Sequence, residues 1–394
     1  MKLLLYSHFF APSVGGVESI VLLIASGLAG LRTAAGPPEF EVTLVTRTSA
    51  ADFDARSLPF KVVRHPSLIR LLRLIRSSDV VHVAGPALAP LILSFLAGKP
   101  ATIEHHGYQA ICLNGLLVHQ PDRQICPGHF QAGRYAECIR CQASESSWIR
   151  SCMNLFTMFP RNFLVRRAAA NIAVTQHVLE RQALPHSVVI LHGIADTTTE
   201  LPPAPSVRDS QRITFGYAGR FVSEKGVELL LDAARLLKQE KFDFEIQLIG
   251  DGPERASLEK KIARYQLESC VHITGFLKGA AFYEALGNVH AIVMPSVWEE
   301  TAGLAAMEQM MRGRLVIAAQ IGGLVEVVGE TALTFSPGNT EALAECMRKV
   351  LRDPSLIDSL GRKARARALD RFAHTRMIEE HANVYREALR KTKG

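Results

Sequence analysis

The chain has 394 residues, 48% of them hydrophobic and 21% charged, which is the composition of a globular protein and excludes a disordered or fibrous one. Its length exceeds what one hydrophobic core organises, so we expect two or three domains. The net charge of +7 is uneven, because residues 1–200 carry 18 Lys and Arg against 13 Asp and Glu, and residues 201–394 carry 27 against 25. The basic first half suits an anionic substrate or membrane surface, although a basic pI alone is also common in plain soluble proteins, and no nucleic-acid partner is predicted.

The chain begins with "MKLLLYSHFFAPSVGG", which predicts a first strand and no signal peptide, because Ser7, His8 and Pro12 break the apolar run. No window approaches the ~18 uninterrupted apolar residues of a membrane-spanning helix. Seven cysteines favour reduced thiols or a metal site over a disulfide framework. We therefore expect a cytoplasmic protein, or one bound peripherally to the inner face of the cytoplasmic membrane.

Short apolar runs alternate with helix-like segments along the whole chain, which predicts parallel sheets covered by helices on both faces. The fold class is therefore α/β, with two doubly wound Rossmann-like domains facing across a cleft. The runs are "KLLLYS", "EVTLVTR", "FKVVRH", "DVVHVAG", "PATIEHH", "NIAVTQ" and "VVILHGI" in the first half, and "ITFGYAGR", "FEIQLIG", "VHITGF", "AIVMPS", "LVIAAQ" and "ALTFSP" in the second.

The proline-rich stretch "TTTELPPAPSVRDSQR" separates the two sets of strands and is a linker by composition. We predict a first domain over 1–196, a linker over 197–212 and a second domain over 213–375. A charged helix over 376–394 could pack back on the first domain.

A glycine pair, Gly15 and Gly16, follows the first strand and opens an amphipathic helix. Paired glycines let the backbone approach a ligand, and the helix N-terminus offers free N–H groups to an anion. A purely structural turn is the alternative. The spacing lacks the G-x-G-x-x-G pattern, which disfavours a nicotinamide dinucleotide site.

Two cations, Arg220 and Lys225, follow the first strand of the second half in "YAGRFVSEKGVELLLDA". At a strand-to-helix turn, such a pair can clamp a diphosphate, with Arg as a fork and Lys as a point charge. The alternative is a solvated turn with surface charges.

Two carboxylates stand eight positions apart in "VMPSVWEETAGLAAMEQM". Eight positions carry a helix ~80° past a whole number of turns, so Glu300 fits a loop before the helix and Glu308 fits the helix itself. Around Gly303, backbone N–H groups would face a phosphate as the helix begins. The two acids could therefore bracket a ligand with a sugar, a diphosphate and a ribose. The alternative is that they complement the helix dipole and the surface.

Together these segments resemble the retaining glycosyltransferases of family 4, which have the GT-B fold. The resemblance extends over nearly the whole chain, through "PSVGGVE", "DVVHVAG", "EHHG", "HGIAD", "GRFVSEKGVELLLDA", "LIGDGPE", "ITGFL", "PSVWEETAGLAAMEQM", "IGGLVEVVG" and "LGRKARARALDRF". It implies transfer of a sugar from a UDP- or GDP-sugar without a catalytic metal and with retention of configuration, and the leaving phosphate would accept the acceptor's proton.

By this resemblance, Glu300 would hold donor-sugar hydroxyls and Glu308 the ribose hydroxyls. Arg220 and Lys225 would hold the diphosphate. Fixed cations suit this reaction because negative charge builds on the leaving diphosphate.

The resemblance also implies supporting roles for backbone groups. N–H groups around Gly303 and Leu304 would assist at the diphosphate, Gly15 and Gly16 would let the first domain close on the donor, and Phe276 would meet the base through its backbone.

His106 of "EHHG" matches the histidine that such enzymes place beside the reacting sugar. The chain departs from the family pattern at His192, where Asn is usual, and at Leu315, where Pro is commoner. Neither departure removes a donor contact named above.

A long irregular stretch at about 107–150 follows His106 and carries four cysteines. Four thiols ending in C-x-x-C could bind a structural zinc or iron, or could be reduced cysteines without a metal. A subset of the same transferases, associated with bacterial polysaccharide assembly, looks similar here, so the insertion is a candidate wall of the acceptor site. The cysteines are Cys112, Cys126, Cys138 and Cys141.

Two basic segments of the first half, "PSLIRLLRLIRSS" and "NLFTMFPRNFLVRR", combine arginines with leucines and aromatics. Such helices can lie on an anionic membrane, and the alternative is a core-facing helix with a solvated arginine edge.

We therefore expect a glycosyltransferase acting on a lipid-linked glycan intermediate in bacterial polysaccharide or glycolipid biosynthesis. A nucleotide-sugar epimerase or hydrolase of the same fold, or a non-catalytic nucleotide-sugar or glycan-binding subunit, are the alternatives.

Overall fold

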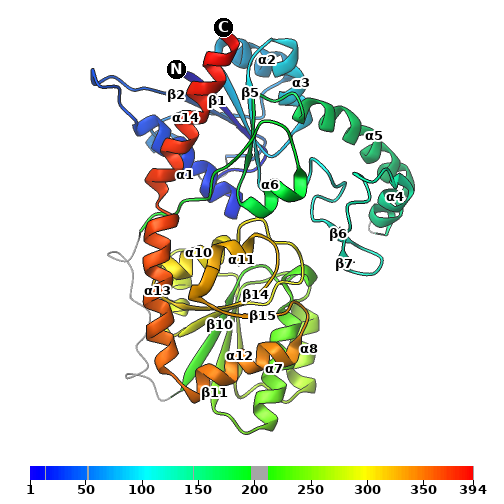
Figure 1. Ribbon diagram of the computed structural model, residues 1–394, viewed down its shortest axis with the longest axis vertical. Coiled ribbons are helices and arrows are strands. Elements are labelled where there is room, and N and C mark those ends of the chain that lie inside the picture. The colour runs from blue at the N-terminus through cyan, green and yellow to red at the C-terminus, as the bar shows by residue number, and fades with distance from the viewer. Residues whose placement is uncertain (14, 51–52, 145, 197–211, 394) are drawn as a thin grey trace. The chain divides into compact units, whose positions relative to one another are not determined.

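The computed structural model in Figure 1 describes residues 1–13, 15–50, 53–144, 146–196 and 212–393. The predicted linker lies outside these residues except for Arg212. The chain divides into two compact units, the first comprising residues 1–193 with 374–394 and the second residues 194–373. Each unit is built on one parallel sheet, so the predicted α/β class with two Rossmann-like halves is confirmed.

The first unit has a seven-stranded sheet in the order β3-β2-β1-β4-β5-β8-β9. Its central strands have mostly apolar sequences, as expected for strands covered on both faces of the sheet. All five residues of β4, "VVHVA", are buried. The order reverses between β1 and β4, and ligands of open α/β sheets bind beside such a reversal. The strands are β1(Lys2–Ser7), β2(Glu41–Thr46), β3(Lys61–Arg64), β4(Val80–Ala84), β5(Ala101–His105), β8(Ala170–Ala173) and β9(Ser187–Val189).

Helices cover this sheet, and the last of them comes from the C-terminal end of the chain. α14 (His374–Lys393) lies beside α1 (Gly16–Gly30) in Figure 1. The two helices approach closely at Gly27, where an added Cβ would lie 2.1 Å from Ile378 Cδ1. The other helices are α2(Leu68–Ser77), α3(Leu88–Leu96), α4(Tyr135–Ala143), α5(Trp148–Val165) and α6(Gln176–Gln182), with the 3-10 turn η1(Ala55–Ser57).

The insertion between β5 and β8 carries a small antiparallel pair, β6 (Val118–His119) and β7 (Gln124–Ile125), followed by α4 and α5. Its two helices pack against each other, and α5 packs against α3. The predicted irregular stretch is therefore partly structured.

The second unit has a six-stranded parallel sheet in the order β12-β11-β10-β13-β14-β15, reversing between β10 and β13. The strands are β10(Ile213–Ala218), β11(Phe244–Ile249), β12(Val271–Gly275), β13(Ala291–Met294), β14(Leu315–Ala319) and β15(Leu333–Phe335). The helices are α7(Val227–Gln239), α8(Arg255–Arg264), α9(Ala280–Gly287), α10(Leu304–Met311), α11(Gly323–Val328), α12(Thr340–Arg352) and α13(Ser355–Arg371), with the 3-10 turns η3(Ser223–Lys225) and η4(Gly329–Thr331).

Candidate functional site

The loops that leave β10 and β13 meet at the reversal point of the second sheet. Gly226 permits this meeting: it has φ 65°, and an added Cβ would lie 2.1 Å from the carbonyl oxygen of Pro295. Val297 N–H also donates to the Glu224 carbonyl at 3.0 Å. The start of α7 and the loop before α10 are thereby held against each other.

Glu300 lies at this meeting point and is only 4% exposed. Its Oε1 accepts a hydrogen bond from Lys225 Nζ at 2.6 Å and another from Ser296 Oγ at 2.6 Å. Burial raises the pKa of the Glu300 carboxyl, but the Lys225 ammonium and these hydrogen bonds outweigh it and hold the pKa below its usual value. The site therefore holds a buried, ionised carboxylate with a cation beside it.

Two glycines, Gly322 and Gly323, contact the backbone of Glu300. Gly323 N–H donates to the Glu300 carbonyl at 2.7 Å. Gly322 has φ 58°, and an added Cβ would lie 2.5 Å from that carbonyl oxygen. The chain before α11 can approach this closely only because residue 322 has no side chain.

Gly303 and Leu304 begin α10, as the two-carboxylate pattern predicts. Gly303 is the residue before the helix and has a left-handed conformation, φ 67° and ψ 51°. The first turn of a helix has N–H groups without intrahelical acceptors, which suits a phosphate. Glu308 lies on the same helix and is exposed. Desolvation by the surrounding protein nevertheless raises the pKa of its carboxyl to about 6, although the positive charge of Arg312 acts to lower it. Glu300 precedes this helix and Glu308 lies within it.

Arg220 and Phe276 are both solvent-exposed at the carboxyl ends of strands in the same unit. Arg220 follows β10, and its carbonyl accepts a hydrogen bond from Tyr217 Oη at 2.8 Å. Phe276 follows β12 and is 62% exposed. Neither side chain is buried in the hydrophobic core, so both are accessible to a ligand.

Gly15 and Gly16 lie at the start of α1 in the first unit, as predicted. An added Cβ at Gly15 would lie 2.4 Å from Glu18 Oε2, because that carboxylate folds back over the glycine. Ser13 Oγ donates to the other oxygen of Glu18 at 3.0 Å. A carboxylate at this helix N-terminus complements the helix dipole.

His106 lies directly after β5, and its ring faces a buried acid. Its Nε2 is 3.4 Å from Glu104 Oε2, and the ring stacks on His192 with centroids 5.3 Å apart. Burial lowers the pKa of His192 and of His82, and the nearby Glu104 offsets part of this. The sequence interpretation singled out His106 and noted His192, but it missed Glu104 and the other histidines around it.

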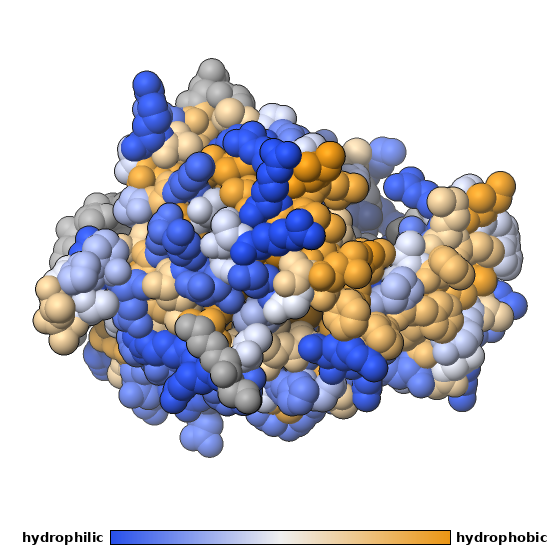
Figure 2. Space-filling view, turned by 90° about the horizontal axis from the view of Figure 1, so that it is seen from above, coloured by the Kyte–Doolittle hydropathy of each residue, from blue (hydrophilic) through white to orange (hydrophobic). Residues whose placement is uncertain are grey.

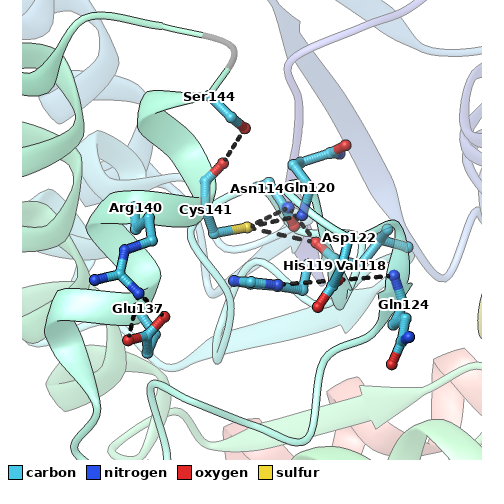
Figure 3. Close-up of polar contacts among 10 residues, drawn as sticks. All are labelled: Asn114, Val118, His119, Gln120, Asp122, Gln124, Glu137, Arg140, Cys141 and Ser144. Carbon is cyan, nitrogen blue, oxygen red and sulfur yellow. Dashed lines mark hydrogen bonds and ion pairs between the residues drawn. The ribbon is translucent and has the colours of Figure 1, made fainter.

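The four cysteines of the insertion are buried and close enough to influence one another. Burial raises the pKa of the Cys138 thiol to about 12, and the neighbouring Cys112, Cys126 and Cys141 raise it further. Figure 3 shows that Cys141 Sγ receives N–H groups from Gln120 and from the Asn114 side chain, at 3.4 and 3.6 Å.

Only one group of three or more metal-binding side chains in the described part of the chain has all its ligand atoms within 4.8 Å of one another. That group is Glu104, His106 and His192, and the four cysteines are not in it. The predicted zinc or iron site at the cysteines therefore stays a prediction.

Ser296 is a further residue that the sequence interpretation missed. A hydroxyl four residues before Glu300 was visible in "PSVWEE", but nothing in the spacing showed that the loop turns it toward the carboxylate.

Comparisons with known proteins agree with this architecture. A 2-deoxystreptamine glucosyltransferase from Streptomyces kanamyceticus is 28% identical over 304 residues, which are 74% of this chain and 70% of that protein. An alpha-D-kanosaminyltransferase of the same organism is 30% identical over 43% of this chain and 45% of its own length.

Solved structures show the same fold over the whole chain. Anabaena HepE in complex with UDP-glucose has a TM-score of 0.70 at 18% identity, covering 97% of this chain and 98% of that one. Sucrose-phosphate synthase from Thermosynechococcus elongatus has a TM-score of 0.72 at 18% identity, covering 99% of both chains. Residues 200–367 match the family model described as glycosyl transferases group 1. The chain thus has the fold of these solved structures, the GT-B fold, and its residues 200–367 are similar to the glycosyl transferases group 1 family.

Proposed function

We propose that this protein is a retaining glycosyltransferase that moves a sugar from a UDP- or GDP-sugar to an acceptor hydroxyl without a catalytic metal. The observation that carries the proposal is the buried Glu300 carboxylate, paired with Lys225 at the reversal point of the second sheet. The pair lies within the segment that matches the family, and the HepE structure that shares this fold contains UDP-glucose.

The two ends of this pair suit the two ends of a sugar diphosphate. Lys225 and Ser296 both bind Oε1 of Glu300, so we assign Oε2 to a donor-sugar hydroxyl. An ammonium has three N–H donors, so Lys225 can hold Glu300 and still donate to a phosphate. Arg220 and the first turn of α10 would supply the remaining positive potential.

The reaction breaks the bond between sugar C1 and the diphosphate oxygen and forms a bond between C1 and the acceptor oxygen. The acceptor's proton passes to the leaving diphosphate, so the products are a glycoside and a nucleoside diphosphate. Negative charge develops on the diphosphate in the transition state, and fixed cations and N–H dipoles lower its energy there. Retention follows when the acceptor attacks from the face that the phosphate leaves.

A donor screen tests the proposal. Thermal shift with UDP, GDP and their sugars should identify one donor, since a ligand at 100 times its Kd stabilises the folded state by ~2.7 kcal/mol. Glu300→Ala should keep the nucleoside diphosphate and lose the added stabilisation from the sugar. Glu330→Ala removes an exposed glutamate of the same unit and should behave as wild type.

Turnover decides between this proposal and its alternatives. Transfer to an acceptor with retained configuration should persist when EDTA is added to the assay. Donor hydrolysis without any acceptor would favour a hydrolase or epimerase, and full cellular activity of Glu300→Ala would favour a non-catalytic binding subunit. Either result would reject the transferase proposal.

We propose further that the acceptor is a lipid-linked glycan at an anionic membrane. No helix in the described ranges is long and apolar enough to span a bilayer. The first unit nevertheless exposes large apolar side chains along α3 and α5, including Phe156 at 77% and Ile149 at 75%. Figure 2 shows apolar side chains gathered on this face and bordered by hydrophilic ones.

Basic residues accompany these apolar side chains. The arginines of α2 and those near the end of α5 are on the same unit, and the Arg167 guanidinium lies 3.8 Å from the Phe163 ring centroid. An interfacial surface that combines aromatics with cations binds anionic lipid by burial and by charge.

Vesicle sedimentation tests the membrane proposal. Vesicles containing phosphatidylglycerol should bind the protein more tightly than phosphatidylcholine vesicles, and salt should weaken the binding. Phe156→Ser and Ile149→Ser should reduce it, whereas Leu369→Ser removes an exposed leucine of the second unit and should not. Equal binding by all variants would contradict the assignment of this face.

A further inference from the structure

Four histidines surround one buried glutamate in the first unit. Glu104 on β5 has no solvent exposure, and its oxygens lie 3.4 Å from Nε2 of His82, of His106 and of His192 and 3.6 Å from Nε2 of His381. Every ion pair that Glu104 makes within the described residues is with a histidine. A buried carboxylate needs positive charge beside it, and a neutral imidazole carries none.

These contacts are too long for ordinary hydrogen bonds, whose N–H···O distances are ~2.7–3.2 Å. Both oxygens of Glu104 and both ring nitrogens of His192 are buried without a hydrogen-bond partner. Native proteins rarely leave buried polar atoms without partners, so each such atom points to a missing partner.

His381 shows which kind of partner is missing. Its Nδ1 lies 2.8 Å from the carbonyl oxygen of Met377, which can only accept, so Nδ1 carries a proton. In the neutral tautomer Nε2 then has a lone pair, and it can bind a cation that lies between it and Oε1 of Glu104. Donation from Nδ1 to a backbone carbonyl is also the usual arrangement of a metal-binding histidine.

The spacing of the atoms suits a metal ion. Ligands at ~2.0–2.2 Å from a tetrahedral zinc ion are separated from one another by ~3.4 Å. Oε2 of Glu104 lies 3.4 Å from Nε2 of His106, and Oε1 lies 3.4 Å from Nε2 of His192. One ligand atom from each of the three residues can be chosen so that all lie within 4.8 Å of one another. Two imidazoles and one carboxylate form a donor set that zinc-class ions prefer.

We propose that Glu104, His106 and His192 bind a divalent transition-metal ion of the zinc class. His381 faces the same carboxylate oxygen as His192 and is the candidate fourth ligand. His82 contacts Tyr385 Oη through Nδ1 at 3.0 Å, and this contact orients its Nε2 toward the other oxygen of Glu104.

The ion would join three parts of the first unit: the end of β5, the segment after β9 and the C-terminal helix α14. It would also occupy Nε2 of His106. Its place is in the first unit, whereas the proposed diphosphate ligands belong to the second. The metal proposal therefore does not depend on the proposed transferase activity.

Metal content and Zn²⁺ affinity test the proposal. The protein is purified without a histidine tag, stripped with a chelator and titrated with Zn²⁺ against a chromophoric chelator. Wild type should bind one ion at this site, and Glu104→Gln and His192→Asn should each weaken that binding by at least ~100-fold, since loss of even an outer-shell partner costs 10–100-fold. His272→Asn removes an exposed histidine of the second unit and should leave it unchanged.

A double variant, Cys138→Ser with Cys141→Ser, separates this site from the cysteine cluster. It should retain the ion bound by Glu104, and its Co²⁺-loaded form should lack the charge-transfer absorption of thiolate ligands. Zn²⁺ binding that is lost with the cysteines and kept in Glu104→Gln and His192→Asn would overturn the proposal. Absence of Zn²⁺ binding by the stripped wild type would overturn it as well, and that measurement needs no variant to fold.

Discussion

Removing either member of the Lys225–Glu300 pair should destabilise the second unit, and the two losses should differ. Lys225→Met leaves a carboxylate that is 4% exposed without its cation. Glu300→Gln leaves the Lys225 ammonium, whose side chain is 27% exposed and can reach water, and the amide still accepts from Ser296. The lysine substitution should therefore cost more.

The burial of the two groups sets the magnitudes. Removing one partner of a fully buried ion pair costs ~3–5 kcal/mol, and the partial exposure of Lys225 reduces this to ~2–4 kcal/mol for Lys225→Met. Glu300→Gln loses one charge-assisted hydrogen bond while the ammonium becomes hydrated, which corresponds to ~1–2 kcal/mol.

The difference between Lys225→Met and wild type should depend on pH. In wild type the folded-state pKa of Glu300 is below its usual value, so its contribution to stability is present above the unfolded pKa of ~4.3 and is lost as pH falls through the folded value. In Lys225→Met burial acts alone and raises the folded pKa, so the carboxylate destabilises the unit at neutral pH and is neutralised in acid. The difference between the two proteins should therefore shrink as pH falls toward ~4, and should close only below the folded pKa of Glu300 in wild type.

Tryptophan fluorescence can follow this unit alone. The chain has two tryptophans, and Trp148→Phe leaves Trp298, whose ring lies 5.4 Å from Lys225 Nζ. Urea unfolding of both variants in that background, at pH 7 and near pH 4.5, gives the required free energies. Equal losses for the two variants at pH 7, or a Lys225→Met loss that does not shrink in acid, would refute the reasoning.

Three further predictions concern other parts of the structure. Gly322→Ala should destabilise the second unit by ~2–4 kcal/mol, because φ is 58° and the new methyl group would clash with the backbone of Glu300. Gly338 has φ 72° with open space around it, so Gly338→Ala should cost only ~1 kcal/mol in the same urea assay. The affinity for the donor should weaken as pH falls through about 6, because Glu308 then gains a proton and accepts fewer hydrogen bonds from the ribose. Titration calorimetry should show this pH dependence in wild type and not in Glu308→Gln. Ile378→Ala should cost the first unit ~2–4 kcal/mol in denaturant unfolding, and a loss below ~1 kcal/mol would contradict its packing on α1.

The alternation of strands and helices was enough to predict the fold. Apolar runs of four to six residues separated by amphipathic segments leave few arrangements other than parallel sheets covered by helices. The pairing of Glu300 with Lys225 could not be predicted in the same way, because 75 positions separate the two residues. Their contact depends on β10 and β13 being neighbours in the sheet, and that order is a property of the whole unit.

The histidine cluster was missed for a similar reason. Its members come from β4, from β5 and the residue after it, from the segment after β9 and from α14, and local spacing connects only Glu104 with His106. One signal was present, since His192 stands where the resembling family usually has Asn. The meaning of that departure becomes clear only when the neighbours of His192 in the fold are known.

The position of α14 at the end of the chain affects the order in which the two units can complete their folding. Its residues Met377, Tyr385 and Ala388 are buried in the first unit, yet the ribosome makes them only after the entire second unit. Domains usually fold as they emerge, beginning with the N-terminal one. Here residues 194–373 form a continuous unit that can fold while the helix is still being translated, whereas the sheet made first must wait with its α14 surface exposed. The unit that is made first is the last to be completed, and in the cell that interval is when a chaperone would be needed.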